Sequence, residues 1–289
     1  MHIAVLGNPG SWYCEDLKQA AELRGHRFSR IDFPRLTAAV GSDSPALFGN
    51  DVDLSQVDAV IVRTMPPGSL EQVVFRMDAL AELEAAGITV LNPPKAIETA
   101  VDKYVTTCRL QAAGLNVPET IVCENFEAAM TAFEQLGGDV VVKPIFGAEG
   151  RGILRVSDPD LALRTFRTLE RIQSVLYLQR YIAHEGFDIR VLTLHGTVLG
   201  GMKRCCDDDF RTNVSRNGRA ERHLLTEKEQ EWALRAAIAV GTQFAGVDLL
   251  YERSGTCHVI EVNAVPGWRA FQKVTGIAVA QQIIESLET

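Results

Sequence analysis

The chain has 289 residues, of which 46% are hydrophobic and 23% are charged, and its formal net charge at pH 7 is -8. This length and hydrophobic content predict a well-buried globular protein with up to three small domains, and they exclude a disordered chain. Nucleic-acid binding draws on clustered lysines and arginines, so the acidic balance argues against a nucleic-acid partner.

The apolar run from Met1 to Gly7 is short and lacks a preceding basic segment, unlike a secretory signal. No apolar stretch approaches the roughly 18 residues that a membrane span needs. The cysteines form no CxxC pair and have no histidine partners at zinc-finger spacing. We therefore expect a cytoplasmic protein with reduced cysteines and no membrane partner.

Strand-like and helical patterns alternate along residues 1–93, which predicts a parallel, Rossmann-like sheet flanked by helices. The turn Gly7-Asn8-Pro9-Gly10 does not match the G-x-G-x-x-G dinucleotide fingerprint, and we interpret it as a tight turn in a scaffold domain. Asn92-Pro93-Pro94 punctuates the chain, and we predict a domain boundary after residue 93. Strands are predicted at 2–6, 59–63 and 89–91, and helices at 15–24 and 70–86.

Residues 94–185 are predicted to form a second, α+β region. A helical pattern from Pro94 ends at Gly114, which is a typical C-terminal stop. The β-branched strand 139–143 and the apolar strand 153–156 flank a glycine-rich tip, and this arrangement predicts a hairpin.

Residues 186–289 are predicted to form a third, α+β region. Short turns join its strands, which favours antiparallel pairing. The predicted fold class is therefore α/β, with an N-terminal parallel-sheet domain followed by two α+β lobes. The strands of the last lobe are predicted at 188–194, 198–204, 247–251 and 258–263, with a helix at 226–244.

Lys143 ends an otherwise apolar strand, and an ammonium group is costly to bury without an anionic partner. Gly147, Gly150 and Gly152 follow, and glycines let backbone N–H groups approach a phosphate closely. This segment is not a Walker A loop, because it lacks that motif and leads into a strand. We interpret it as a hairpin lid over a triphosphate. The alternative is a surface hairpin beside a lysine whose ammonium reaches solvent.

Carboxylates interrupt two predicted apolar strands near the C-terminus. Asp248 lies in the first strand, and alternation in the second puts Glu261 and Asn263 on one face while Ile260 and Val262 take the other. Two carboxylates and an amide oxygen suit magnesium, with phosphate oxygens and water completing the octahedron. The alternative is a structural charge-paired site.

Between these segments lies a basic series that is unusual in an acidic chain. Such charges ordinarily form a solvated face. Alternation along strand 199–204 would place some of them over a nucleotide, where guanidinium groups can hold a transferring phosphoryl group and a substrate carboxylate. The series consists of Arg190, Lys203, Arg204, Arg211, Arg216, Arg219 and Arg222.

Short motifs follow one another in order from about residue 92 to residue 288: Asp102-Lys103, Val142-Lys143-Pro144, Gly147 to Gly152, Asp188-Ile189-Arg190, Asp209-Phe210-Arg211-Thr212-Asn213, Ala245 to Leu250, Glu261-Val262-Asn263 and Pro266-Gly267. This ordered set resembles the ATP-grasp enzymes of the RimK-like α-L-glutamate ligase branch. The resemblance implies an N-terminal pre-ATP-grasp domain, a central lobe with a glycine-rich lid and a C-terminal lobe with a metal site.

The resemblance also implies roles for individual residues. Lys103 and Lys143 would contact ATP phosphates, and Asp248, Glu261 and Asn263 would bind two magnesium ions, for which manganese can substitute. The other residues implied in ATP and substrate binding are Gly147, Gly150, Gly152, Gln179, Arg180, Tyr181, Ile182, Asp188, Arg211, Thr212 and Asn213. The residues implied in catalysis are Arg190, Arg204 and Arg211.

The chain departs from the family pattern at two positions. The family often has Gln-Glu before an aromatic hinge residue, whereas Gln179-Arg180-Tyr181 stands here. The usual Asn-Ser/Ala-Ser-Pro-Gly turn is replaced by Asn263-Ala264-Val265-Pro266-Gly267-Trp268. The Pro-Gly-Trp variant is similar to relatives that act on pterin one-carbon carriers such as tetrahydromethanopterin. We expect Trp268 to stack on the acceptor. The alternative is a tryptophan that packs in the core.

The predicted function is an ATP-dependent carboxylate–amine ligase that works through an acyl phosphate. The resemblance implies addition of L-glutamate to a carboxylate of a cofactor, a small molecule or a protein C-terminus. A homo-oligomer is compatible with the sequence. The alternatives are another ATP-grasp amino-acid or peptide ligase, a nucleotide-binding module without catalysis, and a nicotinamide oxidoreductase, which the missing fingerprint disfavours.

Overall fold

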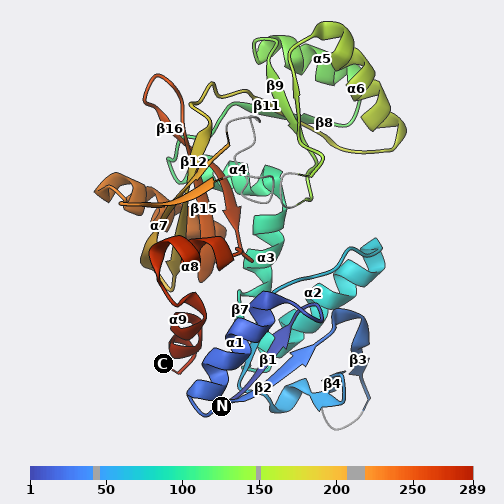
Figure 1. The fold of residues 1–289 in the computed structure, drawn as a ribbon. Helices are drawn as coiled ribbons and strands as arrows, with labels where there is room; N and C mark the ends of the chain where they lie inside the picture. The colour runs from blue at the N-terminus through green and yellow to red at the C-terminus, as the bar shows by residue number, and fades with distance from the viewer. Residues whose placement is uncertain (42–45, 148–150, 207–218, 289) are drawn as a thin grey trace.

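The computed structural model describes residues 1–41, 46–147, 151–206 and 219–288. In these residues the strands form three larger sheets, which we name the N-terminal, central and C-terminal sheets, and one small sheet. Figure 1 shows the N-terminal sheet at the bottom, the C-terminal sheet above it and the central sheet at the top. A helix with the length and apolar character of a membrane span is absent from the described part of the chain.

The N-terminal sheet is parallel, with the strand order β2-β1-β6-β7. Ile3 and Val5 of β1 pack in the cluster that contains α1, whereas Ala4 and Leu6 pack in the cluster that contains α2. Both faces are thus covered, as a strand with apolar side chains on both faces requires. The bounds are β1 His2–Leu6, α1 Trp12–Leu23, β2 Arg27–Ile31, β6 Ala59–Val62, α2 Leu70–Ala85 and β7 Thr89–Leu91.

A small antiparallel sheet lies beside the N-terminal sheet in the chain segment between β2 and β6. Leu36 and Leu47 connect it to the apolar cluster under α2. Its strands are β3 Leu36–Ala39, β4 Ala46–Gly49 and β5 Val52–Asp53, with short 3-10 turns at Phe33–Arg35 and Leu54–Gln56.

The segment that connects the N-terminal and central sheets contains two helices, α3 (Pro94–Val101) and α4 (Lys103–Ala112), where the sequence predicted one helical pattern. The break falls at Asp102, whose backbone is extended and whose carboxylate accepts from the backbone N–H groups of Tyr104 and Val105. Aspartate is a preferred N-cap because it satisfies these otherwise unpaired donors. The break makes Lys103 the first residue of α4.

The central sheet is antiparallel, with the order β10-β9-β11-β8, and α5 and α6 pack against it. The predicted hairpin is confirmed by the pairing of β9 with β10, in which Val142 lies opposite Leu154. Residues 148–150, which include the predicted glycine at position 150, lie outside the described residues. The bounds are β8 Thr120–Cys123, α5 Phe126–Gln135, β9 Val140–Lys143, β10 Leu154–Val156, α6 Pro159–Arg171 and β11 Leu176–Arg180.

The C-terminal sheet is also antiparallel, with the order β14-β13-β12-β15-β16. Helix α7 packs its alanines against Val191, Val247 and Val262 on one face of this sheet. The opposite face carries the charged residues of the candidate site. The bounds are β12 Phe187–Leu194, β13 Thr197–Cys205, β14 Arg219–His223, α7 Glu227–Val240, β15 Phe244–Tyr251 and β16 Cys257–Asn263.

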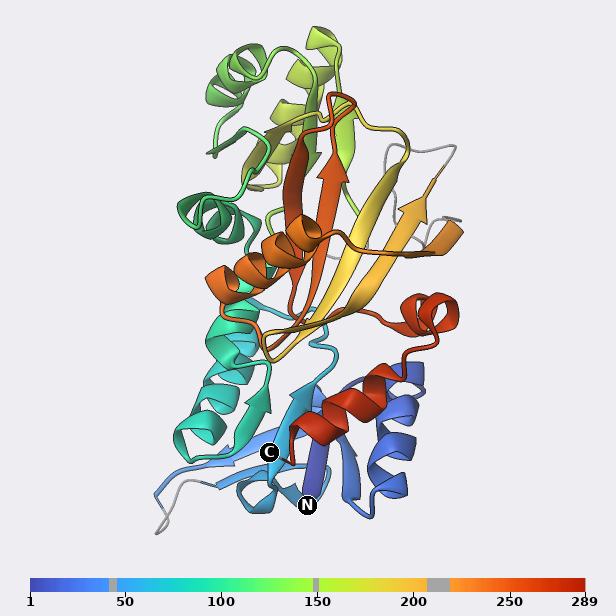
Figure 2. The same ribbon diagram turned by 90° about the vertical axis from the view of Figure 1, so that its left-hand side faces the viewer.

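The last two helices, α8 (Arg269–Thr275) and α9 (Val279–Ser286), join the C-terminal sheet to the N-terminal sheet. One apolar cluster contains Leu17 of α1, Phe271 of α8 and Ile283 of α9. Figure 2 shows α9 beside α1, close to the N-terminus. The parallel N-terminal sheet and the two antiparallel α+β lobes confirm the predicted fold class, and the boundaries after residues 93 and 185 stay predictions.

Candidate active site

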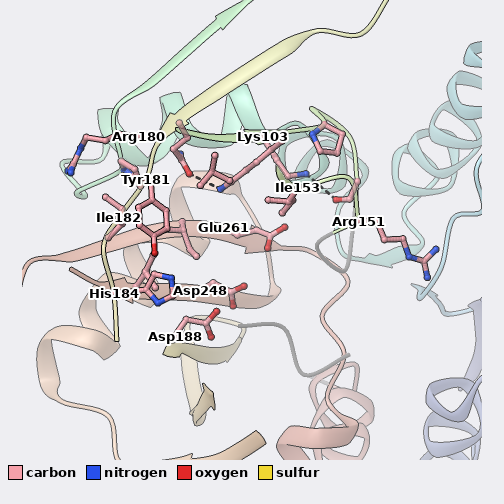
Figure 3. A pocket seen from close by; sticks show the side chains of 18 of the residues that line it. Lys103, Arg151, Ile153, Arg180, Tyr181, Ile182, His184, Asp188, Asp248 and Glu261 are labelled. Atoms are coloured by element: carbon pink, nitrogen blue, oxygen red, sulfur yellow. Dashed lines mark hydrogen bonds between the residues drawn. The ribbon is translucent and has the colours of Figure 1, made fainter. Parts of the chain in front are cut away.

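A pocket lies between the central and C-terminal sheets (Figure 3). Lys103 and Ile153 border it from the side of the central sheet, and Asp188, Asp248 and Glu261 border it from the C-terminal sheet. The pocket brings together predicted residues from distant parts of the sequence, namely Lys103, Lys143, Gly147, Gln179, Arg180, Tyr181, Ile182, Asp188, Arg204, Asp248 and Glu261.

Two lysines reach the pocket from different elements. Lys103 begins α4 and donates to the Gly147 carbonyl oxygen at 3.1 Å. Burial lowers the pKa of Lys143 to about 8, while Glu261 opposes that shift and Lys103 adds to it. Burial also lowers the pKa of Lys103, again against the influence of Glu261. Two lysine ammonium groups that are partly shielded from water therefore line the pocket, where an anion can bind them.

Gln179 anchors the Lys143 ammonium group through a hydrogen bond. Its Oε1 accepts from Lys143 Nζ at 2.6 Å, and its Nε2 donates to Thr120 Oγ1 at 2.9 Å and to the Tyr177 hydroxyl at 3.2 Å. The Tyr177 hydroxyl also lies 2.8 Å from Thr107 Oγ1. Both ends of the Gln179 amide are therefore engaged by the protein, and the side chain fixes the position of the ammonium.

Facing these lysines, carboxylates and guanidinium groups alternate across the C-terminal sheet. Arg190 holds both oxygens of Asp248, with N···O distances of 2.7 and 2.6 Å, and Arg204 holds both oxygens of Asp188 at 2.6 Å. Arg204 Nη2 also lies 2.8 Å from Asp248 Oδ2. Burial by itself would raise the pKa of Asp248, but the two arginines lower it below its ordinary value. The contacts with Arg190 and Arg204 thus keep the buried Asp248 carboxylate ionised.

A β-bulge shapes the strand that carries Glu261. Asp248 pairs with Glu261 but Leu249 pairs with Val259, so Ile260 is the extra residue. Ile260 and Glu261 both line the pocket, whereas Val259 is 3% exposed in the core under α7. The predicted strict alternation, with Ile260 on the opposite face from Glu261, is therefore wrong at this point, because the extra residue shifts the phase of the strand.

The far end of the pocket is formed by the segment after β11. The Arg155 guanidinium carbon lies 3.6 Å from the centre of the Tyr181 ring, and Asp139 holds Arg155 through two hydrogen bonds of 2.9 and 2.7 Å. The His184 ring centre lies 6.0 Å from that of Tyr181. A fixed aromatic ring at the pocket wall suits stacking on a flat heterocycle.

Comparison with known proteins assigns this architecture. A RimK PreATP-grasp domain matches residues 1–97, and a RimK-like ATP-grasp domain matches residues 100–287. The chain belongs to the RimK-like ATP-grasp family. It is therefore an ATP-dependent ligase that joins a carboxylate to an amine.

Relatives of this ATP-grasp protein extend over nearly its whole length. It is 35% identical to the tetrahydromethanopterin:alpha-L-glutamate ligase of Methanosarcina acetivorans, over 98% of this chain and 97% of that protein. It is 31% identical to the ribosomal protein bS6--L-glutamate ligase of Salmonella paratyphi B, over 100% of this chain and 96% of that protein. The structure of the ATP-grasp ligase PsnB complexed with a minimal precursor aligns with a TM-score of 0.78 at 22% identity, over 99% of this chain and 97% of that one.

The donor set of this ATP-grasp protein fits magnesium held jointly with a nucleotide. Asp248 and Glu261 lie opposite each other on neighbouring strands, and Asn263 lies opposite Gly246 two positions further along. Among the described residues no group of three or more His, Cys, Asp or Glu side chains could hold a metal ion without further ligands. Magnesium commonly takes one or two carboxylates and completes its shell with phosphate oxygens and water, so this sparse oxygen set suits it.

Some predicted site residues lie outside the pocket lining. Arg190 contacts Asp248 from the neighbouring strand, and Asn263 ends β16 beyond Glu261. Gly152 adopts a φ of +73°, in the left-handed region that favours glycine. The remaining predictions lie outside the described residues, namely Gly150, Arg211, Thr212 and Asn213.

Other residues that line the pocket were missed by sequence reasoning. Val141 and Leu250 are each two positions from a predicted residue on the same strand, Lys143 and Asp248, so strand alternation could have revealed them. Pro144 and Arg151 lie within two of the motifs that carry the family resemblance, although no role was predicted for either. No sequence signal pointed to the remaining ones, which are Pro118, Ile153, His184 and Ile260.

The predicted stacking of Trp268 on an acceptor is wrong. Its side chain is fully buried, with Nε1 donating to Asp16 Oδ2 at 2.7 Å. Its ring contacts Tyr13 and Phe244 at centroid distances of 4.9 and 5.8 Å. The alternative that Trp268 packs in the core is the correct one, because the ring lies between α1 and the start of β15.

Proposed function

We propose that this protein adds L-glutamate to a carboxylate of a second substrate, and that the pocket between the central and C-terminal sheets is where ATP and magnesium act. The observation that carries the proposal is the opposition of two half-buried lysines, Lys103 and Lys143, to Asp248 and Glu261 across one pocket. Such an arrangement offers cations to phosphate oxygens and carboxylates to a metal ion that the phosphates share.

The proposed reaction has two steps. An oxygen of the acceptor carboxylate attacks the γ-phosphorus of ATP, ADP leaves, and an acyl phosphate forms. The amine nitrogen of glutamate then attacks the acyl carbon, phosphate leaves, and the nitrogen loses a proton to give an amide.

The chain's own residues hold and neutralise the reactants. Lys143, fixed by Gln179, and Lys103 hold phosphate oxygens. Arg190, Arg204 and Arg211 are proposed to balance the charge that develops on the transferring group. Magnesium, when bound by Asp248, Glu261 and Asn263, supplies further neutralisation of the phosphates as a Lewis acid. We propose two ions, with manganese as a working substitute.

The nucleotide base is proposed to lie against Tyr181 and Ile182, with Asp188, Thr212 and Asn213 completing the nucleotide and substrate contacts. Arg180, where the family often has a glutamate, donates to Glu252 Oε1 at 3.2 Å. Backbone groups near Ile182 would then read the base edge. Gly147, Gly150 and Gly152 are proposed to close over the triphosphate as a lid.

The acceptor is proposed to be a cofactor, a small molecule or a protein C-terminus that carries a free carboxylate, by analogy with the pterin and ribosomal-protein ligases among the relatives. We propose a cytoplasmic protein, consistent with an ATP-using ligase, and a homo-oligomer. Another amino acid in place of glutamate is the second candidate, because solved neighbours of this fold include a D-cycloserine synthetase.

The experiment is a screen for ADP release in the presence of ATP, magnesium and L-glutamate. Acceptors would include a carboxylated tetrahydropterin and peptides that end in glutamate, and each positive pair would be checked by product mass. We expect ADP formation that requires both substrates and a product heavier by one glutamate residue. A Glu261→Gln variant should be inactive. Release of AMP, or turnover that ignores the amine, would contradict the proposal.

A further inference from the structure

Asn92 links the N-terminal sheet to both strands of the proposed metal site. It directly follows β7, is 1% exposed, and lies two residues before the start of α3. Its Oδ1 accepts from the backbone N–H groups of Gln243 and Phe244, both at 2.7 Å. Its Nδ2 donates to the carbonyl oxygens of Phe244, at 2.7 Å, and Ala264. One amide therefore joins the start of β15 to the end of β16.

Arg63 makes a second link from the N-terminal sheet. It directly follows β6, is 5% exposed, and donates from Nη2 to the Pro266 carbonyl oxygen at 2.9 Å. Its guanidinium carbon lies 4.3 Å from the centre of the Trp268 ring and 5.0 Å from that of Tyr13. Within the described residues Arg63 Nε has no hydrogen-bond acceptor. A buried guanidinium held by rings and a carbonyl is costly to keep, which favours a specific use for it.

Both links end on the turn that follows the metal-bearing strand. Ala264 is the next residue after Asn263, and Phe244 begins the strand that carries Asp248. A Cβ on Gly246, opposite Asn263, would lie 2.8 Å from Pro266 Cβ and 3.5 Å from Arg190 Nε. The turn therefore packs closely on Gly246, next to Arg190, and a shift of the turn would move the adjoining Asn263.

We propose that Asn92 and Arg63 are positioning residues, through which the N-terminal sheet fixes the strand ends that bind the metal. This inference rests on the proposed function, because it takes Asp248, Glu261 and Asn263 as the metal ligands. The N-terminal region is then part of the metal site's supporting shell. Mutation of residues that support metal ligands in this way typically weakens metal affinity by about 10–100-fold.

The experiment measures manganese binding to the full chain with ADP by electron paramagnetic resonance, which needs no turnover. Arg63→Met keeps apolar volume at a buried site but removes the donor to Pro266, and we expect about a tenfold weaker manganese affinity. The matched control is Arg24→Met. Arg24 also links the N-terminal region to the end of the chain, because it follows α1 and pairs with Glu285 and Glu288 at 2.9 and 2.5 Å. These partners are not part of β15, β16 or the turn that follows β16. Arg24→Met should bind manganese like the wild type.

Asn92→Leu is the second variant, and it should weaken manganese binding at least as strongly, because it leaves four backbone groups without their partner. Should it fail to fold, Arg63→Met decides. Glu261→Gln tests the metal-site assignment on which this inference rests. Unchanged manganese affinity in that variant would contradict the proposed metal site itself. Weak binding in Glu261→Gln together with wild-type binding in folded Arg63→Met, or equal losses in Arg63→Met and Arg24→Met, would overturn the positioning role.

Discussion

Lys143 shows how neighbouring residues determine the charge of a single side chain. Its half-buried ammonium donates to Gln179, an uncharged acceptor, and the largest carboxylate influence on it is that of Glu261. Burial lowers the pKa of Lys143 to about 8, so the free protein loses this charge as the pH rises through that value. Phosphate oxygens stabilise the ammonium and raise the pKa again, so nucleotide binding and protonation of Lys143 are linked.

We therefore predict that ADP with magnesium binds with proton uptake above pH 8, and that nucleotide affinity falls as the pH rises further. At pH 8.5 the uptake should exceed about half a proton per site. Lys143→Met should remove most of that uptake, leaving at most the share of Lys103, and should weaken binding about 10–100-fold, since a charge-assisted hydrogen bond is lost. Titration calorimetry in two buffers of different ionisation enthalpy measures both quantities.

The control is Lys95→Met, which removes an exposed lysine that pairs with Glu98 at 2.7 Å on α3. It should keep the proton uptake of the wild type. Equal uptake in the wild type and Lys143→Met would mean that another group takes the proton and that Lys143 does not hold the phosphates.

For single residues, the sequence predicted which charged side chains lie in the site better than it predicted the contacts that those side chains make. Lys143 and Asp248 could be predicted because each interrupts an apolar strand, where an unpaired charge is costly. The direction of the Gln179 side chain could not be predicted, since its partners Thr120 and Tyr177 lie on two different strands. The environment of Trp268 was equally hidden, because Asp16 is 252 positions away.

At the scale of the element, the bulge in β16 exchanges the roles of two neighbouring residues. Regular alternation from Glu261 would put Val259 in the pocket and Ile260 in the core. The structure has the reverse, with Val259 in the core and Ile260 on the pocket wall. The sequence could not reveal this, because both residues are apolar and one extra strand residue leaves the hydrophobic pattern unchanged. The helix break at Asp102, by contrast, had a local signal in its capping side chain.

The exchange predicts opposite phenotypes for two adjacent alanine substitutions. Val259→Ala should lower the free energy of unfolding by about 2 kcal/mol, because it opens a cavity under α7, and should leave nucleotide affinity unchanged. Ile260→Ala should lower nucleotide affinity several-fold, with a loss of stability below about 1 kcal/mol. Urea unfolding and ADP titration separate the two effects. If Ile260→Ala proves the more destabilising and Val259→Ala the weaker binder, the strand is regular and the bulge is absent.

At the scale of the whole molecule, the two ends of the chain meet around the N-terminal sheet. Arg24 and His26 hold Glu288 with N···O distances of 2.5 and 2.6 Å, and α9 packs on α1. The order of strands and helices predicted three regions, but it did not show that the last helices return to the first. That return is a set of long-range contacts, and local patterns along the sequence do not record them.

The most direct test of the central claim, ligation through an acyl phosphate, follows the acceptor's own oxygen. The acceptor that supports ADP release with L-glutamate would be labelled with 18O in its carboxylate, and the released phosphate would be analysed by mass spectrometry. We predict one 18O atom in phosphate for each amide formed, because the attacking carboxylate oxygen stays on phosphorus when the amine displaces phosphate. Phosphate without the label, or label found in AMP, would contradict the account.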